Sequence, residues 1–256
     1  MKYLKGFGLR KYAVVRALIR WSMPRKCTND GHIFYLNPAD NVITPAVARG
    51  AYEPDETALC KRRIKNGETV IDIGANIGYF TLLFARLVGK EGKVFAFEPD
   101  PTNFRLLEKN VKANGYTNVV CFPTALTDYN GQHELFLHDY NMGDHRLYDS
   151  GTAREKVAVT VARLDDVLPD VSPSFVKIDI QGSEYLMVQG AKNTLAHAKE
   201  LLIEYWPYGL EKAGTTGAAL QQALQELNFH WPDQSNLDRF TPENREFTNI
   251  HATKKT

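Results

Sequence analysis

Four acidic residues follow short apolar runs, in positions where a carboxylate could bind a ligand or accept a proton. They are Asp72, Glu98, Asp179 and Glu204. Parallel sheets bind ligands outside the carboxyl ends of their strands, so acids at several such ends would meet at one rim. A single acid of this kind often caps a helix or forms a surface ion pair. Four together exceed what sheet stability requires, and they predict a binding site.

A glycine-containing turn lies beside the first of these acids. Gly74 and Gly78 follow an apolar strand and precede a helical pattern. Glycine lets backbone N–H groups approach a ligand, and the N-terminus of the next helix adds positive potential. Glu98 lies 20 positions beyond Gly78, the offset at which an acid receives a ribose hydroxyl. The pattern therefore indicates a ligand that carries adenosine.

NAD is the first alternative for such a ligand. Its glycine fingerprint would place glycine at positions 76 and 79, where this chain has Asn76 and Tyr79. Recognition of a pyrophosphate is therefore not expected.

Alternating strands and helices must position these residues. Apolar runs predict strands at residues 69–73, 93–98, 118–122, 174–180 and 201–205. Helical periodicity covers residues 79–88, 101–114, 183–199 and 217–227. This order predicts a parallel α/β sheet with right-handed crossovers, closed by strands near Phe229 and at residues 247–253. Residues 41–45 are predicted to be extended, residues 157–161 to form an edge strand, and the polar residues 138–156 have no clear pattern.

Composition sets bounds on the class of protein. The 256 residues are 43% hydrophobic and 24% charged, which is ordinary for a globular chain. A formal net charge of +1 gives no bulk field that would attract nucleic acid. Three widely separated cysteines form no disulfide framework or paired metal motif, and they favour a reducing, cytoplasmic location.

The first 23 residues differ from the rest because they hold six lysines and arginines and no acid. As a helix they would have one apolar face, interrupted by Lys11. Arg10, Lys11 and Arg16 break the apolar core that a signal peptide or a membrane span needs. The helix could pack on its own domain or on a second copy in a homo-oligomer. Peripheral contact with a membrane surface is the alternative.

Several motifs in order give the chain a specific resemblance. DIGANIGYFT at 72–81, FEP at 97–99, VKIDIQGSE at 176–184 and LIE at 202–204 are similar to the FkbM family of S-adenosylmethionine-dependent methyltransferases. YEP at 52–54 and the glycine–alanine pair at 190–191 resemble the same family. The resemblance implies a class I methyltransferase fold, a Rossmann-like three-layer sandwich. Its seven-stranded, mostly parallel sheet would have an antiparallel last strand. Residues 50–256 would form this domain, after an N-terminal extension at residues 1–49.

The resemblance also implies roles for residues at the matching positions. Those expected around the methionine end of the cofactor are Asp72, Gly74, Asn76 and Gly78. Glu98 would bind the ribose, with Pro99 shaping the turn and Asn103 nearby. Ala125 and Leu126 would lie against the adenine, and Asp179 and Gln181 would line the side where methyl transfer occurs.

Methyl transfer to an alcohol needs a group that removes the hydroxyl proton or binds its oxygen. The candidate bases are Glu184, His145 and Glu204, and His145 is attractive because histidine titrates near neutrality. His145 could equally be a surface residue of a loop. Asp179 and Glu204 could instead share Mg²⁺, but no third ligand is evident, so no metal is expected.

The resemblance implies O-methylation, with a sugar hydroxyl, a similar small molecule or a glycan as acceptor. N-methylation on the same fold is an alternative, and so is a protein that binds the cofactor without transferring the methyl group. The fold alone does not identify the acceptor.

Overall fold

The structure is a computed structural model that describes residues 22–232 and 234–254. The basic helix predicted for residues 1–23 lies outside these ranges, apart from its last two residues, so it stays a prediction. Among the helices described, none is long and apolar enough to cross a membrane.

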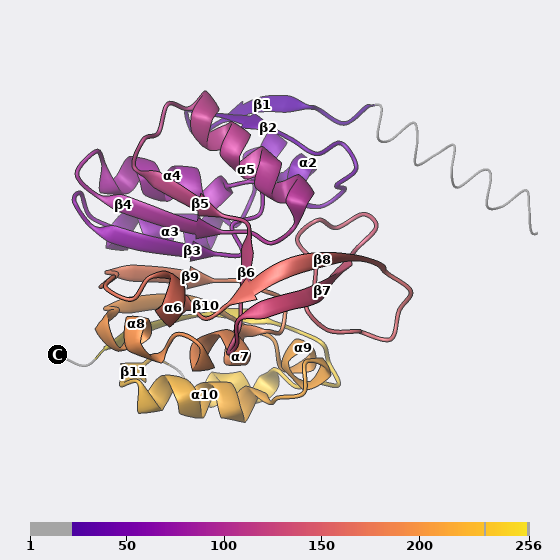
Figure 1. Cartoon of the computed structure of the whole chain (residues 1–256), viewed down its shortest axis with the longest axis vertical. Helices are drawn as coiled ribbons and strands as arrows, with labels where there is room; N and C mark the ends of the chain where they lie inside the picture. Colours follow the sequence, from indigo (N-terminus) through magenta and orange to yellow (C-terminus); the bar gives the residue numbers. More distant parts are fainter. Residues whose placement is uncertain (1–21, 233, 255–256) are drawn as a thin grey trace, which may run out of the picture.

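A seven-stranded sheet forms the centre of the molecule, in the order β11-β12-β10-β9-β3-β4-β5 (Figure 1). Its strands are β3 (Thr69–Ile73), β4 (Lys93–Phe97), β5 (Val119–Phe122), β9 (Phe175–Ile178), β10 (Glu200–Tyr205), β11 (Phe229–His230) and β12 (Thr248–Lys254). The pairs from β10 through β5 are parallel, whereas β12 runs antiparallel to both of its neighbours. The seven-stranded sheet with an antiparallel last strand is therefore confirmed.

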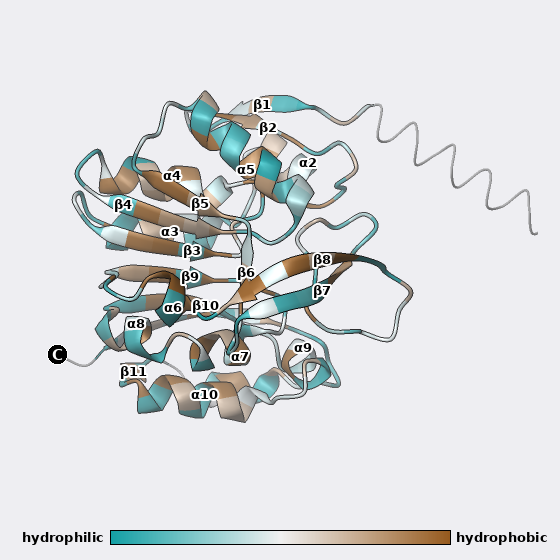
Figure 2. Ribbon diagram, viewed as in Figure 1, coloured by the Kyte–Doolittle hydropathy of each residue, from teal (hydrophilic) through white to brown (hydrophobic). Residues whose placement is uncertain are grey.

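Helices cover both faces of this sheet and complete three layers. One face carries α3 (Pro54–Arg63), α4 (Tyr79–Val88) and α5 (Pro101–Ala113). The other carries α7 (Glu184–Gln189), α8 (Lys192–His197) and α10 (Gly217–Glu226). Figure 2 shows hydrophobic colour along the central strands and mixed colour on α5 and α10, as expected for helices with one buried face.

The turn from β4 into α5 shows how local sequence positions the site. Asp100 caps α5 and its carboxylate accepts the backbone N–H groups of Thr102 and Asn103, at 3.0 and 2.7 Å. Pro101 takes the first helical position, where its missing N–H costs nothing. The helix therefore begins immediately beyond the strand end, which keeps Glu98 at the rim of the sheet.

A smaller sheet projects beside the rim, in the order β6-β8-β7 (Figure 1). It comprises β6 (Thr124–Leu126), β7 (Gly131–Leu137) and β8 (Glu155–Ala162). The prediction of an edge strand at residues 157–161 is wrong, because β8 pairs with β7 on one side and with β6 on the other. The loop of residues 138–154 joins β7 to β8.

The segment before the main sheet packs against it. It contains β1 (Lys26–Asn29), β2 (His32–Tyr35) and α2 (Ile43–Ala48). The side-chain amides of Asn110 on α5 and of Asn114, which caps its C-terminus, pair with the β2 backbone, as a neighbouring strand would. The extended conformation predicted for residues 41–45 is wrong. Asp40 accepts the N–H of Thr44 at 2.5 Å and stabilises the start of a helix there. The division at residue 50 stays a prediction.

The predicted helix at 183–199 is divided into α7 and α8 at Gly190. A Cβ on Gly190 would lie 1.9 Å from the carbonyl oxygen of Thr127, so the chain there packs backbone against backbone. The sequence pattern could not reveal this contact, because Thr127 is distant along the chain. Three short helical segments complete the fold: α6 (Leu164–Val167), α9 (Pro207–Lys212) and the 3-10 helix η1 (Gln234–Arg239).

Candidate active site

A cavity of about 250 Å³ opens at the carboxyl ends of β3, β4, β9 and β10. Ten of the residues predicted for the site lie on its wall: Gly74, Asn76, Glu98, Pro99, Ala125, Leu126, His145, Asp179, Gln181 and Glu204. Four others do not: Asp72, Gly78, Asn103 and Glu184. Segments more than a hundred residues apart in sequence therefore meet at one rim, as the strand-end argument expects.

The turn after β3 fits against the end of β9 with no space for a side chain. Gly74 has a φ of +82°, and a Cβ on it would lie 1.9 Å from the carbonyl oxygen of Asp179. The N–H groups of Gly74 and Ala75 both donate to the carbonyl oxygen of Phe97, at 3.0 and 2.9 Å. Glycine at 74 is thus required both by backbone conformation and by close approach. The backbone of this turn therefore forms one side of the cavity, which we call the glycine cradle.

Glu98 lies next to this cradle and is held by backbone groups. One carboxyl oxygen accepts the N–H of Asn76 at 2.8 Å, and the other accepts the N–H of Asp100 at 2.9 Å. Burial raises the pKa of Glu98 to about 8, although these two hydrogen bonds act in the opposite direction. The position is the one predicted for recognition of ribose hydroxyls.

The wall beyond Glu98 is apolar. Ala125 and Leu126 on β6 are buried and lie on the cavity wall with Phe97 and Leu135. The flat adenine ring of an adenosyl group needs an apolar surface of this kind to pack against. The backbone turn at Gly74, the carboxyl group of Glu98 and this apolar wall together fit an adenosyl ligand.

Asp72 supports the turn from behind. It is 1% exposed, and the hydroxyl of Thr81 donates to its carboxylate at 2.6 Å. Burial raises its pKa. It lines a smaller cavity behind the glycine turn, together with Lys177 and Phe80. Phe80 belongs to the hydrophobic core.

Asn76 and Asn103 both fix the loop of residues 138–154. Their side-chain amides donate to the carbonyl oxygen of Met142, at 2.8 and 3.0 Å. Met142 lies on the cavity wall, whereas Asn103 does not. The glycine turn and α5 therefore hold the loop over the cavity.

Opposite Glu98, two carboxylates share one amide. The side-chain nitrogen of Gln181 lies 2.8 Å from Asp179 Oδ1 and 3.1 Å from both carboxyl oxygens of Glu204. The other oxygen of Asp179 accepts the ammonium of Lys177 at 2.9 Å. Burial, followed by repulsion from Asp179 and Glu184, raises the pKa of Glu204 well above its ordinary value.

A divalent cation shared by Asp179 and Glu204 would need oxygen ligands around it. The Gln181 amide nitrogen, a donor, stands between the two carboxylates. No cluster of three metal-ligating side chains is found within the described ranges 22–232 and 234–254. The arrangement of these side chains therefore does not support a magnesium site shared by Asp179 and Glu204.

His145 lies on the cavity wall, where one of its ring nitrogens accepts a hydrogen bond. Its Nδ1 accepts the backbone N–H of His138 at 3.0 Å, so the proton of the neutral ring is on Nε2. Burial lowers its pKa, which favours the neutral ring. The ring can therefore donate a hydrogen bond from Nε2.

Glu184 is fully buried and shapes the turn after β9. One of its oxygens accepts the N–H groups of Ile180 and Gly182, each at 3.1 Å. These bonds stabilise a turn in which Gln181 has a φ of +57°. Burial raises the pKa of Glu184 to about 7.

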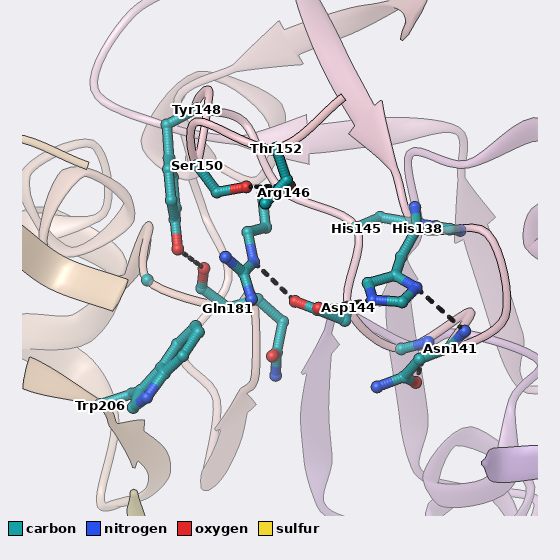
Figure 3. Close-up of polar contacts among 12 residues, drawn as sticks. His138, Asn141, Asp144, His145, Arg146, Tyr148, Ser150, Thr152, Gln181 and Trp206 are labelled. Atoms are coloured by element: carbon teal, nitrogen blue, oxygen red, sulfur yellow. Dashed lines mark hydrogen bonds and ion pairs between the residues drawn. The ribbon is translucent and has the colours of Figure 1, made fainter. Parts of the chain in front are cut away.

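The loop of residues 138–154, which the sequence left without assignment, is held by a charge network (Figure 3). The buried carboxylate of Asp144 accepts Arg146 Nε at 2.6 Å and Arg154 Nη2 at 3.0 Å. The Arg146 guanidinium lies 4.8 Å from the ring centre of Trp206, which follows β10. The Tyr148 hydroxyl donates to the carbonyl oxygen of Gln181 at 2.9 Å. These contacts attach the loop to the ends of β9 and β10.

Two charged residues of the site were not predicted. Lys177 is 3% exposed, and its ammonium lies 4.7 Å from the ring centre of Phe80. Asp179, Glu53 and Asp72 raise the pKa of Lys177 and so keep it charged. Glu53 lies on the cavity wall. The sequence signal for Lys177 was a lone lysine inside an apolar strand. The signal for Glu53 was an acid inside the YEP motif.

Comparison with known proteins gives a match to one family. The profile described as "Methyltransferase FkbM domain" matches residues 72–231. The chain is 27% identical over 183 residues to the 2-O-methyltransferase NoeI of Sinorhizobium fredii, covering 62% of this chain and 73% of that protein. It is 26% identical over 154 residues to the hexuronic acid methyltransferase AglP of Haloferax volcanii, covering 59% of this chain and 62% of that protein.

The fold is also similar to that of a solved structure. A protein from Clostridium thermocellum assigned as an rRNA methylase superposes with a TM-score of 0.52, covering 79% of this chain and 94% of that one. At 14% sequence identity, this likeness is a likeness of fold alone.

Proposed function

This chain belongs to the FkbM family of S-adenosylmethionine-dependent methyltransferases, and we propose that it methylates a hydroxyl group of a sugar or glycan. One observation carries the proposal. The cavity joins an adenosine-type half, with the glycine cradle and Glu98, to a second half lined by Asp179, Gln181 and Glu204. Two relatives point to the acceptor, since one is a 2-O-methyltransferase and the other acts on a hexuronic acid.

The residues of the first half suit S-adenosylmethionine. Glu98 would accept the ribose hydroxyls, and Ala125 and Leu126 would pack on the adenine. The glycine turn would surround the methionine part. When bound, this cofactor supplies a methyl group on a positively charged sulfur, and much of the acceleration then comes from positioning the acceptor.

The second half suits a polar acceptor. Gln181, Glu204 and His145 present donors and acceptors for hydroxyl groups. Phe247 lies on the cavity wall with 60% of its surface exposed. An exposed aromatic ring beside polar groups is suited to the apolar face of a sugar ring. Of the predicted bases, Glu204 and His145 lie on this wall, whereas Glu184 lies behind it; all three stay predictions.

Calorimetric titration with S-adenosylhomocysteine tests the first half. We expect wild-type protein to bind it and Glu98→Ala to lose about 2 kcal/mol, since the hydrogen bonds of Glu98 to the ribose hydroxyls would be lost. Glu91→Ala is the control, because Glu91 is exposed and precedes the opposite end of β4. Wild-type protein that does not bind would contradict the proposal.

Transfer of labelled methyl to a panel of hexosides, methyl hexuronides and short glycans tests the second half. Fragmentation of the product should locate the new methyl on oxygen. A methyl on nitrogen would favour the N-methyltransferase alternative, and binding without any transfer would favour a cofactor-binding protein.

A further inference from the structure

We propose that Glu53 is the proton acceptor for the sugar hydroxyl, an inference that rests on the proposed O-methylation. The acceptor oxygen would bond to the methyl carbon while the carbon–sulfur bond breaks, leaving its electron pair on sulfur. The hydroxyl proton would pass to the Glu53 carboxylate. All atoms and charges then balance, with the neutral thioether and the methyl ether as products.

The first argument compares the hydrogen bonds of the carboxylates on the cavity wall. Both oxygens of Glu98 accept backbone N–H groups. Asp179 accepts Lys177 and Gln181, and both oxygens of Glu204 accept Gln181. Each of these carboxylates is therefore already engaged.

Glu53 differs from these three. Its Oε2 is buried and accepts no hydrogen bond from the described residues, although Glu53 itself lies on the cavity wall. A buried acceptor without a partner costs about 1–3 kcal/mol, so the Glu53 carboxyl keeps hydrogen-bonding capacity that the other three carboxylates have already used.

The second argument is the backbone of Glu53. It precedes α3 with φ +41° and ψ +65°, a left-handed conformation that costs a residue with a side chain about 1–2 kcal/mol. Strain of this kind occurs where a side chain must be held in one place for function. Pro54, which follows at the first helical position, fixes the helix start next to it.

The charges around Glu53 suit a base that works near neutrality. Burial raises its pKa to about 7, and repulsion from Asp179 and Glu56 acts in the same direction. The ammonium of Lys177 and the hydroxyl of Tyr52 oppose this rise. A base is most effective when its pKa is close to the working pH.

The test uses the full chain with Glu53→Gln, which keeps the shape but cannot accept the proton. Asp55→Asn is the matched control, because Asp55 is exposed and lies two residues after Glu53, in the first turn of α3. We expect the kcat for labelled methyl transfer to methyl hexuronides to fall about 10²- to 10⁴-fold in Glu53→Gln only. The pH profile of kcat in wild type should have a limb with an apparent pKa of about 7. This limb should be absent in Glu53→Gln.

Calorimetry separates this role from cofactor binding. S-Adenosylhomocysteine should bind Glu53→Gln and wild type within about twofold, about 0.4 kcal/mol. A large loss of affinity would mean that Glu53 contacts the cofactor, and it would overturn the assignment. Unchanged kcat in Glu53→Gln would overturn it as well.

Infrared difference titration tests the carboxyl without any acceptor. Glu184 as well as Glu53 should contribute protonated carboxyl absorption that titrates near pH 7, so Glu53→Gln should lose one component of this absorption and keep the other. If no such component is lost, Glu53 is not the base. If the loss is found but no sugar is methylated, the failure belongs to the proposed acceptor class.

Discussion

The two halves of the cavity are built in different ways. The half proposed to bind the cofactor consists of a turn, a strand end and a helix start within residues 72–103, with Ala125 and Leu126 of β6 beside them, and backbone groups make most of its polar contacts. The acceptor half joins Glu53, the loop of residues 138–154 and the ends of β9 and β10. Its shape depends on side-chain contacts such as Asp144 with its arginines and Gln181 with its carboxylates.

This difference suggests how the fold can keep one cofactor and change its acceptor. Contacts made by backbone groups do not depend on side-chain identity, so they persist when side chains change, except at a position such as Gly74 that has no space for a Cβ. A half made of side-chain networks can change with the side chains, while the sheet stays the same. Each prediction below tests whether the two halves respond to mutation in these different ways.

The largest effect is expected in the backbone half, for Gly74→Ala. The new Cβ would lie 1.9 Å from the Asp179 carbonyl oxygen, and neither strand end can move away without breaking sheet hydrogen bonds. We expect a loss of more than about 3 kcal/mol in unfolding free energy, together with loss of S-adenosylhomocysteine binding. Urea unfolding and calorimetry measure the two effects.

Gly67→Ala is the control for this change. Gly67 has the same φ of +82°, but a Cβ on it would meet nothing within 4 Å. It should cost only about 1 kcal/mol, the conformational penalty alone. Equal losses at positions 67 and 74 would mean that close approach to β9 is unimportant.

The next effect concerns the charge network of the acceptor half. Asp144→Asn would leave the buried Arg146 and Arg154 without their counter-charge, at a cost of about 3 kcal/mol. Limited proteolysis should then cut within residues 138–154, whereas the Kd for S-adenosylhomocysteine should change by no more than a few fold. Glu134→Gln is the control, since its ion pair with Lys156 is exposed and should contribute less than about 1 kcal/mol.

A smaller effect should appear in the pH dependence of stability through Glu98. Its folded pKa of about 8 lies above the ordinary value of 4.5, so the folded state holds more protons between these values. The contribution of Glu98 to unfolding free energy therefore falls as pH rises from about 4.5 to 8. Glu98→Gln should make the decline in urea midpoint over this range less steep, and an unchanged slope would contradict the burial argument.

The cofactor half was the more predictable from sequence, for a physical reason. Glycines, an acid at a fixed offset and a capped helix are local signals, and the turn they predict is local as well. The strand ends also placed Asp179 and Glu204 correctly on the rim. Sequence spacing could not tell that Asp72 faces inward to Thr81, because that depends on which face of the strand the helix covers.

The acceptor half was less predictable because its contacts depend on how a loop folds and packs, which leaves no periodic pattern in the sequence. Nothing near Asp144 shows that it will meet Arg154, and nothing near Gly190 shows that it will pack on Thr127. Helical periodicity across residues 183–199 was real, but tertiary packing divided the helix. Lys177 was overlooked because a charge in an apolar strand is informative only once its partners are known.

The smallest effect is expected for Tyr148→Phe, which tests one contact between the loop and the strand end. The hydroxyl donates to the Gln181 carbonyl at 2.9 Å, and its loss should cost about 1 kcal/mol in unfolding free energy. Gln181 would then hold Asp179 and Glu204 less firmly, so the KM for the acceptor should rise while the Kd for S-adenosylhomocysteine stays constant. Tyr129→Phe is the control, because its bond to His133 is exposed and should contribute less than about 0.5 kcal/mol. A rise in the cofactor Kd without a rise in KM would show that the loop supports the cofactor half instead, and the division between backbone and side-chain halves would no longer hold.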